Sequence, residues 1–305
     1  MKKSESSLTS LIAAFSRAYH SQNDAPKIFD DYFAKDLITK HEFNNIQENM
    51  VQGIQFFNKN IAEKLKGDSE ELLKWIVQVQ LSPTPLARAA YCEKVLLNEI
   101  RLGVLQYVIL GAGLDTFSLR HPELDSTLEI FEIDHPATQE FKKNRLDSAN
   151  FKLPNNLHFV PMDFTKEFSY LCLMESGFNN KKTFVSLLGV SYYLTQEEIS
   201  NLLNYLFANL PSGSSIVMDY ADENLFKEKG ISDRVSNMVK MAAASGEPMK
   251  SCFTYSEMEL LLEKSNHLLI YEHVTPKAIQ NLYFNKREDY LTAFETIHYI
   301  HAVKK

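Results

Sequence analysis

The sequence predicts an α/β fold in which a doubly wound, mostly parallel sheet follows a helical extension. From residue 104 onward, short apolar runs alternate with helical segments, which is typical of a parallel sheet covered by helices. The first run, 107–110, breaks into Gly111-Ala112-Gly113, and the second, 128–133, ends on Asp134. Residues 1–103 show helical periodicity without a strand pattern. We therefore expect a core at 104–305 and an N-terminal helical cap at 1–103.

The composition describes an ordinary soluble globular protein, with 45% hydrophobic and 23% charged residues in a chain of 305. The formal net charge of −7 argues against a nucleic-acid partner, because phosphate binding needs a basic surface. The N-terminal stretch is too polar for a signal peptide, and no 18 apolar residues run together. We therefore expect a cytoplasmic protein with no membrane partner. The three cysteines are widely spaced, so neither a disulfide framework nor a zinc site is expected.

The N-terminal extension divides into helical segments by the spacing of its apolar residues. The expected segments are one around Leu8–Phe15, one from about Pro26 to Leu37, one within 46–80 that breaks at Gly67-Asp68, and one from Pro85 to Gly103. Such an extension either packs on the sheet or lies over the mouth of its ligand site.

The core is expected to contain strands at 107–110, 128–133, 158–160, 183–188, 215–220, 268–271 and within 297–303. Thr195 with Glu198 and Thr254 with Glu257 form capping boxes, which predict that a helix follows each threonine. An insertion, 222–252, separates the fifth strand from the second of these helices. Long insertions are more often functional than decorative, so we expect this one to act as a lid.

Gly111-Ala112-Gly113 and Asp134 together indicate a nucleotide-like ligand. Glycines let a backbone approach a ligand closely, and an acid at the end of the second strand can bind ribose hydroxyls. Asp134 lies 21 residues beyond Gly113, near the spacing of about 20 that this mechanism expects. Thr116 occupies the third position of the G-x-G-x-x-G fingerprint, so the dinucleotide pattern is incomplete.

Further candidates follow other strands at the same edge of the sheet. Asp163 comes directly after the third strand, where an open α/β sheet presents its carboxyl edge to a ligand. Tyr192 and Tyr193 follow the fourth strand, and for them packing and ligand contact are equally good interpretations. The histidines show no metal spacing, so each is expected to be structural and no metal is expected.

Four segments together resemble the leucine carboxyl methyltransferase family of class I S-adenosylmethionine-dependent methyltransferases. They are VILGAGLDTFSLR, IFEIDHP, VPMDF and FVSLLGVSYYLT, and the resemblance extends to SRAYH, FDDYFAKDLI and the SGEP of residues 245–248. The resemblance implies a seven-stranded sheet with its last strand antiparallel, S-adenosyl-L-methionine as cofactor, and methyl transfer as activity.

The resemblance also assigns cofactor-binding residues. Arg88 should hold the methionine carboxylate, and Gly111 and Gly113, with Ala112 between them, should line the methionine and ribose. Asp134 should take the ribose hydroxyls, and Asp163 with Phe164 the adenine. Leu188-Gly189 completes the set after the fourth strand, where protein-directed members tend to have Glu-Gly. The LLGVSYYLT form is more similar to the small-molecule, polyketide-type branch.

The sequence therefore predicts an O-methyltransferase that acts on a carboxyl or hydroxyl oxygen of a small molecule. The alternatives are a protein C-terminal carboxyl methyltransferase, an NAD-dependent oxidoreductase and a cofactor-binding regulator without catalysis. Only a hydroxyl acceptor needs a base, for which His20 is a weak candidate. The oligomeric state stays open. The expected acceptor-binding residues are Arg17, Tyr19, Tyr192, Tyr193 and, in the methionine-containing insertion, Met241.

Overall fold

The computed structural model describes residues 8–166 and 168–305 and contains one seven-stranded sheet. Its strands are β1 (Gln106–Leu110), β2 (Glu129–Asp134), β3 (Leu157–Pro161), β4 (Thr183–Leu187), β5 (Ser215–Ala221), β6 (Leu268–Val274) and β7 (Ile297–Lys304). They lie in the order β3-β2-β1-β4-β5-β7-β6, and β7 is antiparallel to both of its neighbours while the other pairs are parallel. The predicted fold class is therefore confirmed, including the antiparallel last strand.

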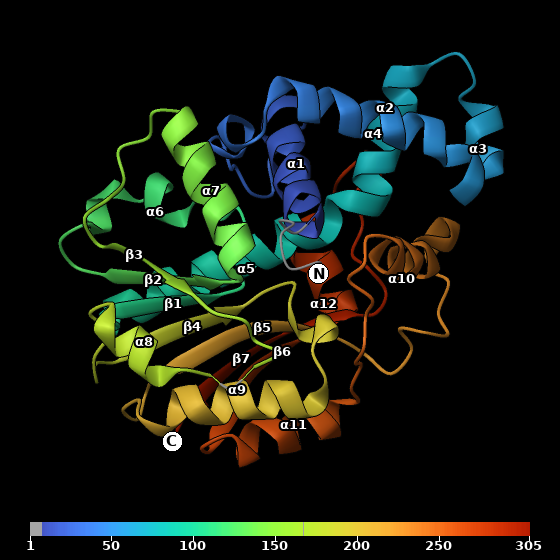
Figure 1. Cartoon of the computed structure of the whole chain (residues 1–305). Helices are drawn as coiled ribbons and strands as arrows, with labels where there is room; N and C mark the ends of the chain where they lie inside the picture. The colour runs from blue at the N-terminus through green and yellow to red at the C-terminus, as the bar shows by residue number, and fades with distance from the viewer. Residues whose placement is uncertain (1–7, 167) are drawn as a thin grey trace.

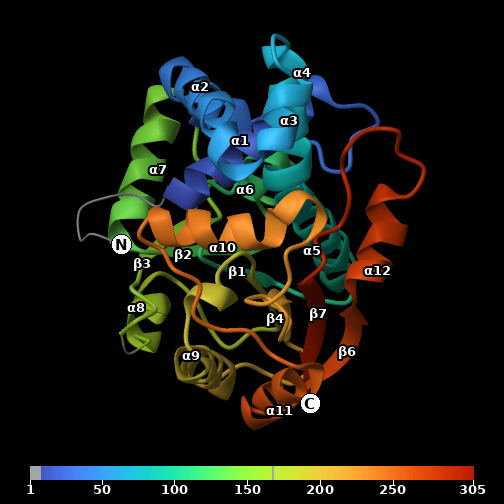
Figure 2. The same cartoon turned by 90° about the vertical axis from the view of Figure 1, so that its right-hand side faces the viewer.

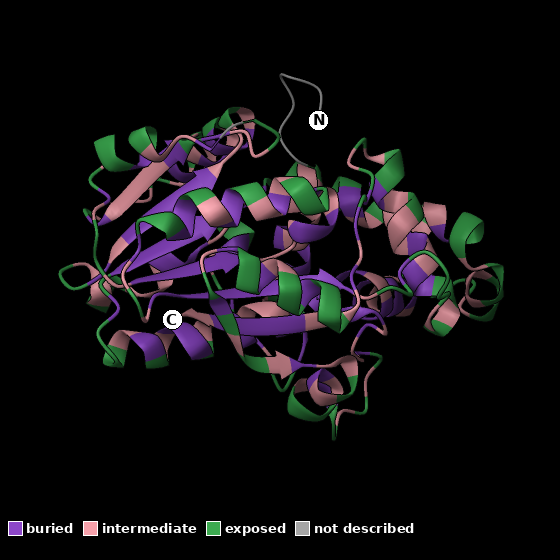
Figure 3. Ribbon diagram, turned by 90° about the horizontal axis from the view of Figure 1, so that it is seen from below, coloured by how far each residue is buried: buried purple, intermediate pink, exposed green. Residues whose placement is uncertain are grey.

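Helices cover both faces of this sheet (Figure 1). One face carries α8 (Tyr170–Glu175), α9 (Gln196–Ala208) and α11 (Tyr255–Lys264); the other carries α5 (Pro83–Arg101), α6 (Phe117–Arg120), α7 (Pro136–Ser148) and α12 (Pro276–Ile279). Short helical turns η3 (Pro122–Leu124), η4 (Ser191–Tyr193) and η6 (Gln280–Phe284) join these elements. β1, β4 and β5 are buried along their whole length between the two layers, as uninterrupted apolar runs predict (Figure 3).

The capping boxes predicted in the core are both present. The hydroxyl of Thr195 accepts the backbone N–H of Glu198, and the Glu198 side chain accepts the N–H of Thr195 at the start of α9. Thr254 and Glu257 do the same at the start of α11. Each box satisfies two backbone donors that have no partner within the helix, which fixes where the helix begins.

Helices that precede β1 lie over one side of the sheet (Figure 1). They are α1 (Leu8–Asn23), η1 (Ala34–Leu37), α2 (Lys40–Phe57), α3 (Lys59–Lys64), α4 (Ser69–Ile76) and the π-helix η2 (Val77–Leu81), which leads into α5. The predicted break at Gly67-Asp68 is present, because Gly67 has a φ of +93° and Asp68 caps α4. None of the helices in 8–166 and 168–305 is both long and apolar enough to span a membrane.

The helix predicted from about Pro26 to Leu37 is wrong, because most of this stretch is a loop that ends in η1. Two side chains, one from α1 and one from the stretch itself, accept hydrogen bonds from its backbone. His20 Nε2 accepts the N–H of Ile28 at 2.8 Å, and the carboxylate of Asp31 accepts the N–H of Ala34 at 3.2 Å. Such side-chain bonds compete with helical ones, and the apolar spacing reflects burial of the loop rather than a helical face.

The insertion 222–252 contains the turn η5 (Ile231–Asp233) and the helix α10 (Arg234–Ala244), which lies beside α1 and η2 (Figure 2). Arg234 anchors the start of α10. It is 1% exposed, and its guanidinium binds Glu295 at 3.0 Å and the hydroxyl of Thr292 at 2.9 Å. The guanidinium also donates to the carbonyl of Ala293. The insertion is therefore held firmly at its N-terminal end.

Glu132 on β2 and Lys142 on α7 form a buried ion pair of 2.5 Å beneath the predicted ligand edge. Burial raises the pKa of Glu132 to about 7, although the charge of Lys142 acts to lower it. Oε1 of Glu132 has no hydrogen-bond partner in the described part of the chain. The negative charge of this carboxyl is therefore poorly satisfied in the folded state.

The stability of the protein is expected to fall as this carboxyl ionises. Because the folded pKa of about 7 lies above the ordinary value of 4.5, the contribution of Glu132 is complete below pH 4.5 and is lost as the pH rises through 7. The double variant Glu132→Gln/Lys142→Met should lack this decline, since a neutral pair replaces the ionisable one. Urea unfolding from pH 4.5 to 8 measures the difference. An equal decline of the free energy of unfolding with pH in wild type and in the double variant would contradict the assignment of this decline to Glu132.

Candidate functional site

Gly111 and Gly113 form the turn after β1 in a conformation that favours glycine. Their φ angles are +75° and +51°, and the N–H of Gly111 donates to the carbonyl of Ile133 at 2.8 Å. A methyl group added at Gly111 would lie 2.3 Å from Val190 Cγ2, and one added at Gly113 would lie 3.0 Å from Ser10 Cβ. The first turn of α1 and the loop after β4 thus lie directly against the glycine loop.

Asp134 lies at the end of β2 with its carboxylate turned to the glycine loop. Its two oxygens accept the backbone N–H groups of Gly113 and His135, each at 2.6 Å. Burial raises the pKa of Asp134 and outweighs these two hydrogen bonds, which act to lower it. Each carboxylate oxygen keeps a second lone pair, so the group is oriented by the backbone and can still accept from ligand hydroxyls.

Arg88 on α5 reaches the ends of β4 and β5. Its Nη1 donates to the hydroxyl of Tyr192 at 2.9 Å and to the fully buried carboxylate of Asp219 at 3.2 Å. Asp219 also accepts the N–H of Gly189 at 2.7 Å. Burial disfavours the guanidinium charge, but Tyr192 and Asp219 outweigh it and raise the pKa of Arg88. A fixed cation therefore lies beside the fourth strand, as a bound carboxylate requires.

Asp163 and Phe164 lie after β3, on the other side of the glycine loop. Asp163 accepts the hydroxyl and the N–H of Thr165, at 2.7 and 3.1 Å. Burial acts to raise the pKa of Asp163, but the bonds from Thr165 and the charge of Lys166 lower it. Phe164 approaches Gly111 and also lines a cavity of about 310 Å³ against α9. Leu188 is half-buried at the end of β4 and packs on the core.

Arg17 is part of a cluster around the buried carboxylate of Asp31, and its contact with an acceptor stays a prediction. Its Nε donates to Asp31 at 2.8 Å and its Nη2 to the carbonyl of Leu114 at 2.8 Å. Thr116, at the third fingerprint position, donates to the same carboxylate at 2.6 Å and accepts from Arg120 at 3.0 Å. The cluster ties the cap to the helix that follows the glycine loop.

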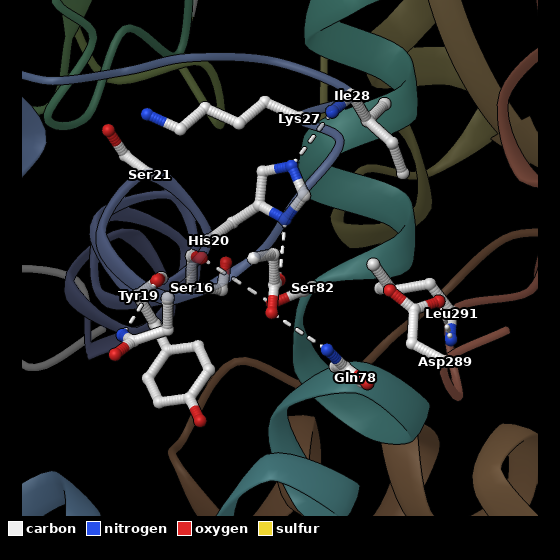
Figure 4. A network of polar contacts seen from close by, with 12 residues as sticks. Ser16, Tyr19, His20, Ser21, Lys27, Ile28, Gln78, Ser82, Asp289 and Leu291 are labelled. Carbon is white, nitrogen blue, oxygen red and sulfur yellow. Dashed lines mark hydrogen bonds and ion pairs between the residues drawn. The ribbon is translucent and has the colours of Figure 1, made fainter. Parts of the chain in front are cut away.

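His20 and Tyr19 lie inside the cap (Figure 4). His20 is fully buried; its Nε2 accepts from Ile28, so its Nδ1 is the protonated nitrogen and donates to Asp24 at 2.6 Å. Asp24 also accepts from Gln78 at 2.7 Å. The ring of Tyr19 points away from this network, and burial raises its pKa to about 12. This setting suits structural roles, because neither ring nitrogen of His20 is left for an acceptor.

Tyr193 and Met241 pack on two apolar clusters, which contain Ala112 and Leu114 respectively. Tyr193 is half-buried, and its ring packs edge-on against Tyr192 with 5.0 Å between centroids. Met241 on α10 packs on the cluster that contains Leu114. Glu247, after α10, accepts a hydrogen bond from the hydroxyl of Thr9 on α1. The structure thus brings the insertion, the cap and the loop after β4 together at this point.

Sequence reasoning missed two acids at this edge. Asp219 belongs to no recognisable motif. Its place near the carboxyl end of β5 agrees with the general rule that ligands bind at the carboxyl ends of parallel strands. Glu247 belongs to the SGEP segment that is part of the family resemblance, but the resemblance assigns no binding role to this residue. In the described ranges, no group of three or more His, Cys, Asp or Glu side chains could hold a metal ion.

The family model of leucine carboxyl methyltransferase matches residues 10–207, more than half of the chain. The chain belongs to the leucine carboxyl methyltransferase family. A Bacillus subtilis (strain 168) relative, YktD, provisionally named an S-adenosyl-L-methionine-dependent methyltransferase, is 67% identical over 305 residues and 100% of both chains. A Mycobacterium marinum protein with the same provisional description is 29% identical over 160 residues, which are 52% of this chain and 50% of that one.

A solved structure from Thermobifida fusca YX, provisionally named a methyltransferase, is similar to this leucine carboxyl methyltransferase family member in fold. It is 14% identical, with a TM-score of 0.54, and the match covers 99% of this chain and 96% of that one. The family and the relatives show that the protein is an S-adenosylmethionine-dependent methyltransferase.

The site residues fit S-adenosylmethionine, which supplies an activated methyl group on a sulfonium. The glycine turn offers close backbone approach, and Asp134 offers an oriented carboxylate for the ribose. Arg88 offers a fixed cation for the methionine carboxylate, and Asp163 with Phe164 lies on the side expected for the adenine. These four groups come from α5 and from the ends of three neighbouring strands.

Asp219→Asn is expected to weaken binding of S-adenosylhomocysteine about 10- to 100-fold. The substitution removes the charge that holds Arg88, and a hydrogen bond to a charged group contributes roughly 1.5–3 kcal/mol. Calorimetry measures the dissociation constant, with the melting temperature recorded to separate unfolding. Asp222→Asn is the matched control, because its carboxylate contacts His298 at 3.3 Å instead of Arg88. Equal affinities of the two variants would contradict a role for Asp219 in the site.

Proposed function

We propose that the protein is an O-methyltransferase that acts on a small molecule. The observation that carries the proposal is that the first turn of α1 covers the glycine loop, because Ser10 packs on the buried Gly113. Tyr193 and Met241 pack on the clusters that contain Ala112 and Leu114, and they would supply aromatic and flexible apolar surface to an acceptor. A covered, partly apolar site can enclose a small acceptor, so it favours a small molecule rather than a large protein surface as acceptor.

The alternatives have weaker support. A protein C-terminal carboxyl acceptor is less favoured because Leu188 stands where protein-directed members tend to have glutamate. An NAD-dependent oxidoreductase is less favoured because Thr116 is buried and bonded to Asp31, where a dinucleotide fingerprint has a glycine that allows close packing. A regulator without catalysis would bind the cofactor and methylate nothing.

The residues of the chain would act by holding and aligning the reactants. Methyl transfer needs the acceptor oxygen in line with the methyl group at near-attack distance, in a site that excludes water. Arg88, held by Asp219, and Asp134, held by Gly113, would fix the cofactor at two points along its length. The first turn of α1 and the segment after α10 would then close over the acceptor, as their contact through Thr9 and Glu247 suggests.

The test combines cofactor binding with an acceptor screen. Calorimetry should detect S-adenosylhomocysteine, while NAD should give no heat of binding and no thermal shift. Tritiated S-adenosylmethionine should then label members of a panel of small phenols, alcohols and carboxylic acids, and the label should be lost on demethylation of the oxygen. Labelling of peptide C-termini with no labelling of the panel would refute the proposal, as would NAD binding without S-adenosylhomocysteine binding.

A further inference from the structure

We propose that Tyr192 is a positioning residue for the methyl donor, because its hydroxyl orients the guanidinium of Arg88 toward the amino-acid carboxylate of the donor. The proposal goes beyond the O-methyl transfer proposed above, since it concerns the donor and holds for any acceptor. It rests on Arg88 as the residue that binds this carboxylate. It gives Tyr192 a role at the donor in place of the acceptor contact that the sequence predicts.

The hydroxyl of Tyr192 belongs to a closed set of hydrogen bonds with Arg88 and Asp219. Nη1 of Arg88 donates to this hydroxyl at 2.9 Å and to Oδ2 of Asp219 at 3.2 Å. The hydroxyl donates its own proton to the same Oδ2 at 3.3 Å. With Asp219 alone, the guanidinium would be free to rotate about a single hydrogen bond. The second acceptor, Tyr192, fixes the plane of the guanidinium.

Nη2 and Nε are the nitrogens through which Arg88 would bind a ligand carboxylate. Nη1 has two N–H groups, and Tyr192 and Asp219 accept both of them. Nη2 and Nε can bind a carboxylate through two parallel hydrogen bonds, provided that the guanidinium and the carboxylate are suitably oriented. The orientation that Tyr192 imposes therefore affects recognition of the donor carboxylate and leaves recognition of the rest of the donor unchanged.

Gly189 lets the guanidinium lie directly on the backbone that follows β4. Its φ is +73°, and a methyl group added there would lie 2.5 Å from Nη1 and 2.6 Å from Cζ of Arg88. The N–H of Gly189 also donates to Oδ1 of Asp219 at 2.7 Å. The guanidinium thus packs on the backbone and is bonded at Nη1, while the Arg88 side chain remains 15% exposed for a ligand.

The position of Tyr192 is itself fixed through its backbone. The carbonyl of Tyr192 accepts the N–H of Lys250 at 2.6 Å, and the carbonyl of Ser191 accepts the hydroxyl of Ser251 at 3.1 Å. The hydroxyl of Ser191 donates to the backbone carbonyl of Asp219 at 2.6 Å. The end of the insertion and β5 therefore hold the turn η4, on which Tyr192 lies.

Burial and protonation suit Tyr192 to this role better than to contact with an acceptor. The residue is 5% exposed, whereas the neighbouring Tyr193 is half-buried. Burial raises the pKa of Tyr192 well above its ordinary value; the charge of Asp219 adds to this effect, and the charge of Arg88 acts against it. The hydroxyl therefore stays protonated at neutral pH, so it accepts from Arg88 and donates to Asp219 at the same time.

The test compares S-adenosylhomocysteine with its decarboxylated analogue, S-adenosyl-3-thiopropylamine, which differs from it by the loss of the carboxylate. Removing the carboxylate from the ligand avoids an Arg88 variant, which would leave Asp219 buried without its cation. Calorimetry measures the dissociation constant of each ligand for wild type and for Tyr192→Phe. The melting temperature shows whether the variant is folded.

Wild type should bind S-adenosylhomocysteine more tightly than the decarboxylated analogue. Tyr192→Phe should weaken binding of S-adenosylhomocysteine about tenfold, because the charged pair with the carboxylate loses its alignment. The analogue should bind wild type and Tyr192→Phe equally, which a general structural defect of the variant would not produce. If Tyr192→Phe does not fold, Tyr192→Met, which also lacks the hydroxyl but keeps a long apolar side chain, takes its place.

Tyr91→Phe is the matched control. Tyr91 lies on the same helix as Arg88, is buried, and donates its hydroxyl to a carboxylate, that of Glu272, at 2.7 Å. The control therefore removes a comparable hydrogen bond without touching Arg88, and it should bind both ligands as wild type does. An equal loss of S-adenosylhomocysteine affinity in Tyr91→Phe and Tyr192→Phe would overturn the proposal.

Equal affinity of wild type and Tyr192→Phe for S-adenosylhomocysteine would overturn the proposal, and so would an equal loss of affinity for both ligands. Wild type that binds the two ligands equally, or binds neither, would overturn it too, because Arg88 would then bind no donor carboxylate. These affinities are measured without an acceptor. Failure of the acceptor screen would therefore refute only the proposed small-molecule O-methylation.

Discussion

Asp134→Ala is expected to weaken the binding of S-adenosylhomocysteine about 100-fold or more. Asp134 is held by the N–H groups of Gly113 and His135, so its carboxylate is already oriented when the ribose arrives. Hydrogen bonds to a charged group contribute roughly 1.5–3 kcal/mol each, and two ribose hydroxyls would use two of them. The alanine also leaves the two backbone donors without their acceptor, which disorders the glycine turn.

Calorimetry at fixed pH measures this dissociation constant, and Glu129→Gln provides the matched control. Glu129 begins the same strand, and its 44% exposed side chain pairs with His158 at the opposite edge of the sheet. The control should bind with unchanged affinity. The affinity of Asp134→Asn should lie between those of Asp134→Ala and Glu129→Gln, since asparagine keeps one oxygen acceptor without the charge. Wild-type affinity in Asp134→Ala would rule out ribose recognition by this residue.

Arg234→Ala is expected to lower the free energy of unfolding by about 3–5 kcal/mol. The guanidinium is buried and bonds Glu295, Thr292 and the carbonyl of Ala293, so its loss leaves several buried acceptors without a donor. Its stacking over the ring of Phe294, with 4.5 Å from Cζ to the centroid, is lost too. Both effects act at the base of the insertion.

Urea unfolding quantifies this change against Arg101→Ala, an exposed arginine at the end of α5. Surface substitutions of this kind usually stay within about 0.5 kcal/mol of wild type. Because Arg234 touches none of the cofactor residues, the variant should keep its affinity for S-adenosylhomocysteine below its melting temperature. A loss of stability below about 1 kcal/mol would show that the insertion is not anchored through Arg234.

The sheet could be predicted from the sequence because its signals are local. An apolar run such as Thr183–Leu187 can be buried on both faces only as a central strand, and a capping box such as Thr195 with Glu198 marks a helix start within four residues. The helix predicted after Pro26 was wrong because the shape of this stretch depends on contacts that are not local. Its shape depends on His20 and Asp31, whose bonds to its backbone cannot be read from apolar spacing.

The same division applies to the site. The spacing between Gly113 and Asp134 follows from one strand, one helix and one strand, so it could be read directly, and the hydrogen bond between them is present. The partnership of Arg88 with Asp219 joins residues 131 positions apart and has no local signal. The bond between Arg17 and Asp31 has no local signal either, because Asp31 lies in the loop that periodicity misread as a helix.

Asp31 also links two parts of the molecule thermodynamically. One carboxylate accepts from Arg17 of the cap and from Thr116, three residues after Gly113. A coupling free energy between two sites is reciprocal, so whatever orders the glycine loop also stabilises the cap, and loosening the cap lowers affinity for the methyl donor. Part of that affinity therefore resides in residues that never touch the donor. The N-terminal helices are in this sense an energetic component of the donor site, beyond the cover that they form.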